Sequence, residues 1–152
     1  MLPYFAENCL ELFMKEWIDK GRSFVAIEAK AGEVIGHVAI EEWPHCLEIR
    51  SVVTAPGFRN MGVNTRLTEF VVNKMFEGYP DAVLMELKSE TSNGHTLLMN
   101  AIGFIEVPLS ELQLLGGAIR NPGPRWHLYT LTLGQYKAYL LKAQERDPNG
   151  RK

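Results

Sequence analysis

The residues best suited to chemistry lie in one short stretch, Arg59-Asn60-Met61-Gly62-Val63-Asn64-Thr65. Pro56 and Gly57 end an apolar run before it, and a helical pattern over Arg66–Phe76 follows it. Backbone N–H groups at the start of a helix lack intrahelical partners and attract anions. Gly62 lets the backbone approach such an anion closely. This order of strand, loop and helix start predicts a phosphate site, and an ordinary capped strand-to-helix connection is the alternative.

The composition is that of a globular protein and not of a disordered one. Of the 152 residues, 46% are hydrophobic and 22% are charged. This length fits one domain, which we expect over residues 1–146, with a flexible tail at 147–152. The net charge of -2 offers no general basis for binding nucleic acid or an anionic membrane, although a small phosphate ligand remains compatible with it.

The cysteines and histidines indicate neither a disulfide framework nor a metal centre. Cys9 and Cys46 form no CxxC pair, so we expect free thiols in a reducing cytoplasm. The N-terminus lacks the layout of a signal peptide, and no apolar run reaches the ~20 residues that span a bilayer. No metal site is predicted, because HExxH spacing is missing among the histidines, His37, His45, His95 and His127.

Periodicity predicts the elements that must position the loop. A helix is expected over Pro3–Lys20, followed by a hairpin of strands over Ser23–Ala29 and Val34–Glu42. The remaining elements are a strand over Cys46–Thr54, the helix over Arg66–Phe76, a strand over Ala82–Lys88, a helix over Gly94–Ala101, strands over Gly103–Val107 and Trp126–Leu133, and a final helix around Tyr136–Ala143. A helix between the Cys46 and Ala82 strands makes them parallel. The prediction is an α/β fold with a central mixed antiparallel and parallel sheet flanked by helices.

At this point the sequence resembles the GNAT superfamily of acetyl-CoA-dependent N-acyltransferases. The resemblance rests on Pro56–Asn64, which is similar to the family signature P-x-x-[RQ]-x-x-G-x-[GA], on the flanking strand order, and on Gly103-Phe104 after the short helix. It implies a GNAT-like fold, acetyl-CoA as co-substrate and a primary amine as acceptor. The family's usual strand ahead of the first helix is missing from the predicted elements, so the sheet is expected to begin with the Ser23 strand.

The resemblance further implies that the strand before the loop holds pantetheine and that the loop holds the pyrophosphate. The residues implied are Val52, Val53 and Thr54 for pantetheine, and Arg59, Met61, Gly62, Val63, Asn64 and Thr65 for the phosphates. Asn64 departs from the family, which has Gly or Ala there. Its side chain either crowds a phosphate or hydrogen-bonds to it.

Glu48 is implied as the general base, because many family members carry Glu eight residues before the Pro of the signature. The alternative for Glu48 is a solvated strand residue. Met99 stands where many members have a Tyr that protonates the leaving thiolate, and a thioether has no proton to donate. We interpret Met99 as apolar core or pocket wall. The acid is then His95, Tyr129 or solvent, or the thiolate leaves unassisted.

Two hypotheses about function follow. The first is an N-acetyltransferase in which an amine attacks the thioester directly, with the protein orienting the amine and accepting its proton. The second is a non-catalytic protein that keeps CoA binding for regulation or assembly, and the departures at Met99 and Asn64 motivate it. The acceptor is not identified by the sequence. Two copies are expected to pair through the last strand or helix.

Overall fold

The fold is described from a computed structural model of the chain. It describes residues 10–17, 22–89, 97–115 and 125–146. They fall into two compact units, each described by itself: the first comprises Met1–Glu41 and Ile49–Lys74, and the second comprises Glu42–Glu48 and Met75–Lys152. The predicted tail at 147–152 lies outside the described residues. The single domain over 1–146 stays a prediction.

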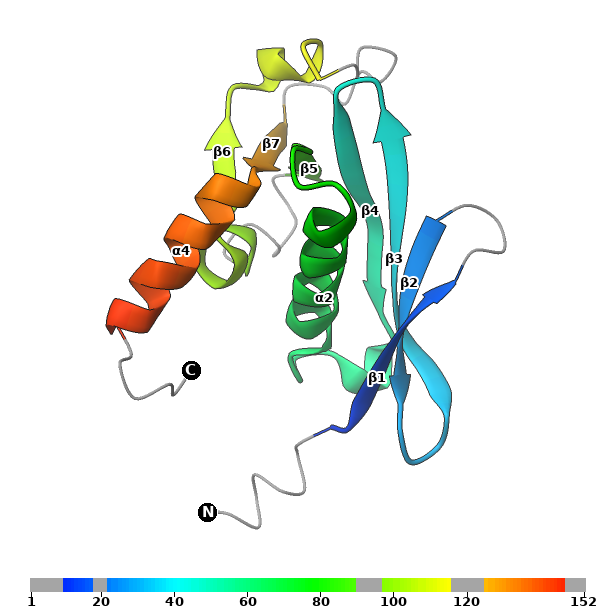
Figure 1. Ribbon diagram of the computed structural model, residues 1–152. Helices are drawn as coiled ribbons and strands as arrows, with labels where there is room; N and C mark the ends of the chain where they lie inside the picture. Colours follow the sequence, from blue (N-terminus) through cyan, green and yellow to red (C-terminus); the bar gives the residue numbers. More distant parts are fainter. Residues whose placement is uncertain (1–9, 18–21, 90–96, 116–124, 147–152) are drawn as a thin grey trace. The chain divides into compact units, whose positions relative to one another are not determined.

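Neighbouring strands form the sheet of the first unit (Figure 1). Their order is β1 (Leu12–Trp17), β2 (Arg22–Glu28), β3 (Glu33–Trp43) and β4 (Cys46–Thr54), and the ends of β3 and β4 that meet at the hairpin turn belong to the second unit. β2 and β3 are antiparallel, with Arg22 opposite Ile40 and Glu28 opposite Glu33. The predicted hairpin is therefore confirmed, and β4 has the predicted bounds.

The predicted helix over Pro3–Lys20 is wrong where the structure describes it. Leu12–Trp17 is a strand, β1, which pairs antiparallel with β2. Phe13 and Trp17 are 64% and 48% exposed, and the strand residues next to each of them are half-buried. Over so short a segment the apolar residues fit a strand as well as a helix, and the backbone pairing offered by β2 favours the strand. The sheet therefore begins with β1 and not with β2.

The helix after β4 is longer than predicted. A 3-10 helix, Pro56–Phe58, follows β4, and α2 (Val63–Gly78) begins at Val63 instead of Arg66. The start of α2 lies close to β3, because a Cβ built on Gly36 would be 3.1 Å from Cγ1 of Val63. A glycine at this point of β3 therefore lets the first turn of α2 pack directly on the sheet.

The sheet of the second unit runs from β4 to β5 (Leu84–Ser89), β7 (Trp126–Leu131) and β6 (Ile105–Val107), in that spatial order. β4 and β5 are parallel, with Leu47 opposite Leu84 and Glu48 opposite Met85. β7 is antiparallel to both β5 and β6. The predicted mixed α/β sheet, with its parallel pair of strands, is confirmed.

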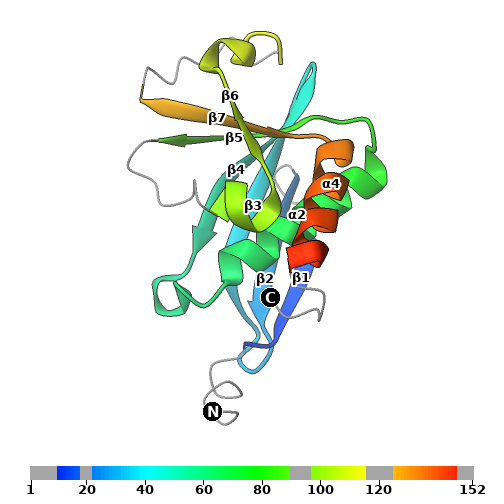
Figure 2. The same ribbon diagram turned by 90° about the vertical axis from the view of Figure 1, so that its left-hand side faces the viewer.

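Helical segments lie on both sides of this second sheet. A π-helical turn, Leu97–Ile102, precedes β6, a 3-10 helix, Leu109–Leu112, follows β6, and α4, Leu133–Arg146, follows β7. Figure 2 shows the 3-10 helix on one side of β5, β7 and β6, and α4 on the other. Met85 and Leu128 pack with Leu112 of the 3-10 helix. Because side chains alternate along strands, Glu86 and Tyr129 point to the opposite face, where α4 lies.

The turn between β2 and β3 depends on the carboxylate of Glu28. It accepts hydrogen bonds from the backbone N–H of Lys30 at 2.7 Å and of Ala31 at 2.9 Å, and these bonds hold the pKa of Glu28 below its ordinary value. Because the pKa of Glu28 is lower in the folded state, its ionised form stabilises the fold at pH values above its unfolded-state pKa. This stabilisation is lost as the pH falls through the folded-state pKa. Between about pH 7 and about pH 3, the wild type is expected to lose more thermal stability than Glu28→Gln. Equal losses of Tm in the two proteins would contradict this role.

Candidate active site

The loop after β4 curls tightly before α2 begins. Asn60 and Gly62 have positive φ angles of 63° and 78°, which Gly adopts freely and Asn more readily than most residues. The carbonyl of Gly62 accepts the N–H of Arg66 at 3.0 Å. The N–H groups of Val63–Thr65 therefore belong to the first turn, where intrahelical partners are lacking. Val63 is buried and Thr65 half-buried, so backbone N–H groups are what this turn offers an anion.

Two side chains of the loop are tied to neighbouring groups. Nε of Arg59 donates to the carbonyl of Thr54 at 3.3 Å, and its guanidinium has further N–H donors for an anion. Oδ1 of Asn64 accepts the hydroxyl of Thr68 at 3.0 Å, one turn along α2. This hydrogen bond directs the Asn64 side chain along the helix, which argues against its crowding a phosphate at the loop. Met61 is 37% exposed at the rim of the loop.

The end of β4 presents an unsatisfied hydroxyl. Val53 is 55% exposed and Val52 half-buried. Oγ1 of Thr54 is buried without a hydrogen-bond partner among the described residues. A buried hydroxyl without a partner is destabilising, and the amide groups of a pantetheine arm would satisfy it. The residues at the end of β4 therefore fit the arm of acetyl-CoA that the resemblance implies.

Glu48 lies near the start of the same strand, in the part that belongs to the second unit. It is 2% exposed, so the alternative of a solvated strand residue is wrong. Nε1 of Trp43 donates to Oε1 of Glu48 at 2.7 Å. Trp43 is the last residue of β3, and the turn at Pro44 and His45 brings it beside β4. A buried carboxylate needs hydrogen-bond donors, and this one has an indole N–H.

Cys46 lies two residues before Glu48 and shares its face of β4. Its Sγ lies 3.4 Å from the carbonyl oxygen of Leu115, to which the thiol donates. Burial, and then the nearby charge of Glu48, raise the pKa of Cys46 to about 12. The thiol therefore stays protonated at neutral pH and does not act as a nucleophile. Glu48 therefore remains the candidate base on this part of β4.

Comparison with known proteins shows to which family the chain belongs. The sequence profile of the Acetyltransferase (GNAT) family matches residues 2–99. The chain belongs to this acetyltransferase family. No curated protein matched the chain in sequence. The predicted resemblance and the class of acyl-CoA-dependent acetyltransferase are thus confirmed.

Solved structures of GNAT proteins share the fold of this acetyltransferase. A family member from Elizabethkingia anophelis with acetyl-CoA bound gives a TM-score of 0.60 at 17% identity, over 80% of this chain and 98% of that chain. The Bacillus subtilis acetyltransferase in complex with CoA gives 0.61 at 14% identity, over 81% and 99%. A GNAT acetyltransferase from Staphylococcus aureus Mu50 gives 0.57 at 15% identity, over 74% and 68%. At these identities the similarity shows the fold.

The acetyltransferase also buries a second carboxylate, that of Glu86. It is 2% exposed, its Oε1 pairs with Nζ of Lys88 at 2.7 Å, and its Oε2 has no hydrogen-bond partner among the described residues. Burial raises the pKa of Glu86, against the lowering effect of Lys88. Glu86 points to the α4 face of the sheet, whereas Glu48 shares a face with Met85. Glu86 is paired with a cation, and Glu48 is bonded to an indole.

Of the two predicted acid side chains, Tyr129 lies within the described residues. Tyr129 is 1% exposed, and burial, followed by the charge of Glu106, raises the pKa of its hydroxyl. It is first of all a core residue of β7. Met99 is 43% exposed in the π-helical turn, so its interpretation as apolar core is wrong. His95 lies outside the described residues.

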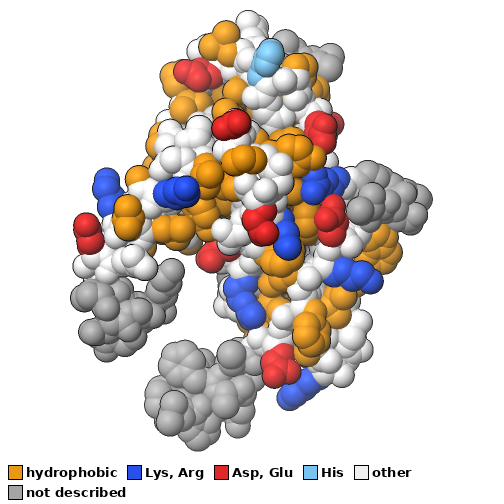
Figure 3. Space-filling model, viewed as in Figure 1, with side chains coloured by type: hydrophobic (Ala, Val, Ile, Leu, Met, Phe, Trp, Pro, Cys, Tyr) orange, Lys and Arg blue, Asp and Glu red, His pale blue; other side chains and the backbone are white. Residues whose placement is uncertain are grey.

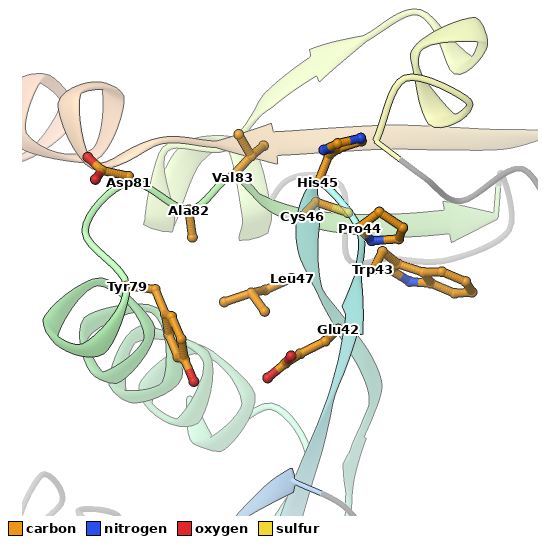
Figure 4. Close-up of a pocket in the computed structure, with 10 residues that line it drawn as sticks. All are labelled: Glu42, Trp43, Pro44, His45, Cys46, Leu47, Tyr79, Asp81, Ala82 and Val83. Carbon is orange, nitrogen blue, oxygen red and sulfur yellow. The ribbon is translucent and has the colours of Figure 1, made fainter.

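A surface depression of about 330 Å³ lies at the tip of the β3–β4 hairpin. Its lining comprises Glu42, Trp43, Pro44, His45, Cys46, Leu47, Tyr79, Asp81, Ala82 and Val83. In Figure 4 the side chains of Glu42 and Tyr79 lie on either side of Leu47, and Trp43 extends away from them. Because Glu42 and Trp43 are consecutive in a strand, they point to opposite faces. The side chains of Glu42 and Leu47 therefore point to the face opposite the Trp43–Glu48 hydrogen bond.

The sequence analysis did not identify Trp43 as the partner of Glu48. The available signal was the two-residue turn, which pairs Trp43 with Cys46 across the hairpin and so places it on the face of Glu48. Glu86 also went unnoticed, because a Glu within an apolar strand gives no sign of its partner. Within the described part of the chain, no group of three or more His, Cys, Asp or Glu residues is arranged to hold a metal ion.

Proposed function

We propose that this acetyltransferase transfers the acetyl group of acetyl-CoA to a primary amine that attacks the thioester directly. Acetyl-CoA supplies an acyl group that is already activated, so the chain has to orient the amine and accept its proton. Val52–Thr54 and the donors of Arg59–Thr65 hold the CoA moiety, and Glu48 is the base. One observation carries the proposal: β4 bears a buried, indole-bonded carboxylate near its start and ends, before an N–H-rich loop, at a Thr54 hydroxyl that has no partner in the described part of the chain.

In this reaction Glu48 takes the proton that the amine loses while the new C–N bond forms and the C–S bond breaks. Glu48 then releases that proton to solvent. Met99 has no proton to donate and is exposed, and Tyr129 is buried in the core. We therefore assign protonation of the thiolate to solvent.

The surface charge is compatible with binding a small acyl donor such as acetyl-CoA, and it offers no basis for binding a polyanion. In Figure 3 acidic and basic side chains are interspersed on the visible face, and the net charge of the chain is -2. No helix among the described residues has the length and apolar character needed to cross a membrane. Cys46 is a free buried thiol, which supports the reducing cytoplasm as the place of action. Pairing of two copies through α4 stays a prediction that the 63% exposure of Leu141 supports.

Binding of acetyl-CoA tests the proposal and the role of the loop together. Acetyl-CoA at millimolar concentration is expected to raise the Tm of the wild type. Gly62→Ala is expected to weaken binding about tenfold, because a side chain at positive φ strains the loop by roughly 1–2 kcal/mol. Gly57→Ala is the matched control, since both glycines have nothing within 4 Å of a Cβ and only Gly62 has positive φ. Isothermal calorimetry measures the affinities.

Two outcomes of this experiment have separate meanings. A wild type that gains no thermal stability from acetyl-CoA or CoA would overturn the proposed function. Equal affinities of Gly62→Ala and Gly57→Ala would leave the function standing and overturn the role of the loop conformation.

A second candidate function is a non-catalytic CoA-binding protein with a role in regulation or assembly. The exposed Met99, at the position where many family members have a Tyr, favours it. CoA binding without release of free thiol, across a panel of primary amines, would support this candidate. Turnover of any amine that is lost in Glu48→Gln would exclude it.

A further inference from the structure

The hydrogen bond between Trp43 and Glu48 joins two arms of one hairpin. The indole Nε1 donates to Oε1 at 2.7 Å, and the carboxylate is 2% exposed. Indole is a donor only and does not titrate, so it bonds to the carboxylate and never competes for its proton. A hydrogen bond to an ionised acceptor is roughly twice as strong as a neutral one.

The indole ring is itself held in place by packing. Trp43 is half-buried against a cluster of buried side chains from β4, β5, β7 and the 3-10 helix, namely Cys46, Met85, Leu87, Leu112 and Leu128. A ring packed in this way has few rotamers, so its N–H points in one direction. The hairpin turn also limits how far Trp43 can move from β4. The orientation of the Glu48 carboxylate is therefore set by a rigid donor.

We propose that Trp43 is a positioning residue of the acetyl transfer, which fixes Oε1 of Glu48 and so orients the carboxylate to take the proton of the amine. This inference rests on the proposed function, in which Glu48 is the base. Trp43 itself touches neither the amine nor the reacting carbonyl in this scheme. It acts by keeping the base in one rotamer and by stabilising its charged form.

The test is Trp43→Phe, which keeps an aromatic ring and removes the N–H donor. We expect kcat to fall about tenfold, the size of one hydrogen bond to a charged group. We expect the KM for acetyl-CoA to stay unchanged, because the loop that binds it is untouched. The pH profile of kcat should change as well, because the base loses a fixed hydrogen-bond donor. Trp126→Phe on β7, where Trp126 is 36% exposed, is the matched control and should leave kcat and the profile unchanged.

Loss of packing alone would not change the pH profile of kcat. A second substitution separates the packing of the Trp43 ring from its hydrogen bond to Glu48. Replacing Trp43 with benzothienylalanine keeps the bicyclic ring and puts sulfur in place of the N–H. This protein is expected to keep the Tm of the wild type and to show the kcat and pH profile of Trp43→Phe. Wild-type kcat and pH profile in the benzothienylalanine protein would overturn the proposal, even if Trp43→Phe fails to fold.

Glu48→Gln distinguishes failure of this inference from failure of the proposed function. If Glu48→Gln is fully active, Glu48 is not the base and both fall. If Glu48→Gln is inactive while the benzothienylalanine protein is unchanged, only the role of Trp43 falls. If the inference holds, Trp43→Phe adds little to the loss already present in Glu48→Gln, because the two residues act as one unit.

Discussion

Glu48→Gln is expected to lower kcat/KM for acetyl transfer by about 10²–10⁴-fold, the usual contribution of a positioned general base. The amide cannot accept the proton of the amine, but its oxygen can still accept the indole N–H of Trp43, which lies 2.7 Å from Oε1 in the wild type. The hairpin should therefore keep its structure. The loss should appear in kcat, with acetyl-CoA affinity preserved, because the loop that binds CoA is unchanged.

Release of free thiol from acetyl-CoA with a primary amine measures the reaction, and calorimetry measures the retained affinity. Glu42→Gln is the matched control, since Glu42 is an exposed carboxylate of the same hairpin on the opposite face. It should leave kcat/KM within about twofold of the wild type, as expected for a surface substitution away from the site. Equal activities of Glu48→Gln and Glu42→Gln would show that Glu48 is not the base.

Gly103→Ala is expected to destabilise the protein by about 2–5 kcal/mol, from backbone strain and overpacking combined. Gly103 has a φ of 96°, an angle that residues other than Gly rarely adopt. A Cβ there would lie 2.5 Å from Cγ and 2.7 Å from Cβ of Tyr139 on α4. Neither atom is the far end of a flexible chain, so α4 has to shift. Tyr136, one turn earlier on α4, packs on Phe76 with ring centroids 5.9 Å apart, which limits that shift.

Urea unfolding monitored by circular dichroism measures the change, with the midpoint compared at constant slope. Gly134→Ala is the matched control, because Gly134 lies in the first turn of α4 and a Cβ there meets nothing within 4 Å. It should be neutral or stabilising by up to about 1 kcal/mol. In the double variant Tyr139→Ala/Gly103→Ala, the stability lost through overpacking should be regained, whereas the loss caused by backbone strain should remain. A Gly103→Ala protein as stable as Gly134→Ala would contradict this account.

The N-terminal segment shows that a local pattern of apolar residues does not always distinguish a helix from a strand. In Leu12–Trp17 the apolar residues fit a helix and a strand, and nothing within the segment distinguishes them. The deciding partner is β2, which pairs Leu12 with Glu28 and Trp17 with Ser23. Pairing of this kind depends on residues elsewhere in the chain, so tertiary contacts override local preference.

The sequence by itself determined the family, the β2–β3 hairpin, the parallel pair β4 and β5, and the loop that ends at α2. Each of these rests on local chemistry, in which Pro56 and Gly62 shape the loop and a crossover helix requires parallel strands. The tertiary structure alone decided that β1 is a strand, that Gly103 lies against Tyr139, and that Glu48 is buried and hydrogen-bonded to the indole of Trp43. The reason is physical: burial and hydrogen-bond partners arise when separate segments pack together, and the order of residues in one segment does not encode them.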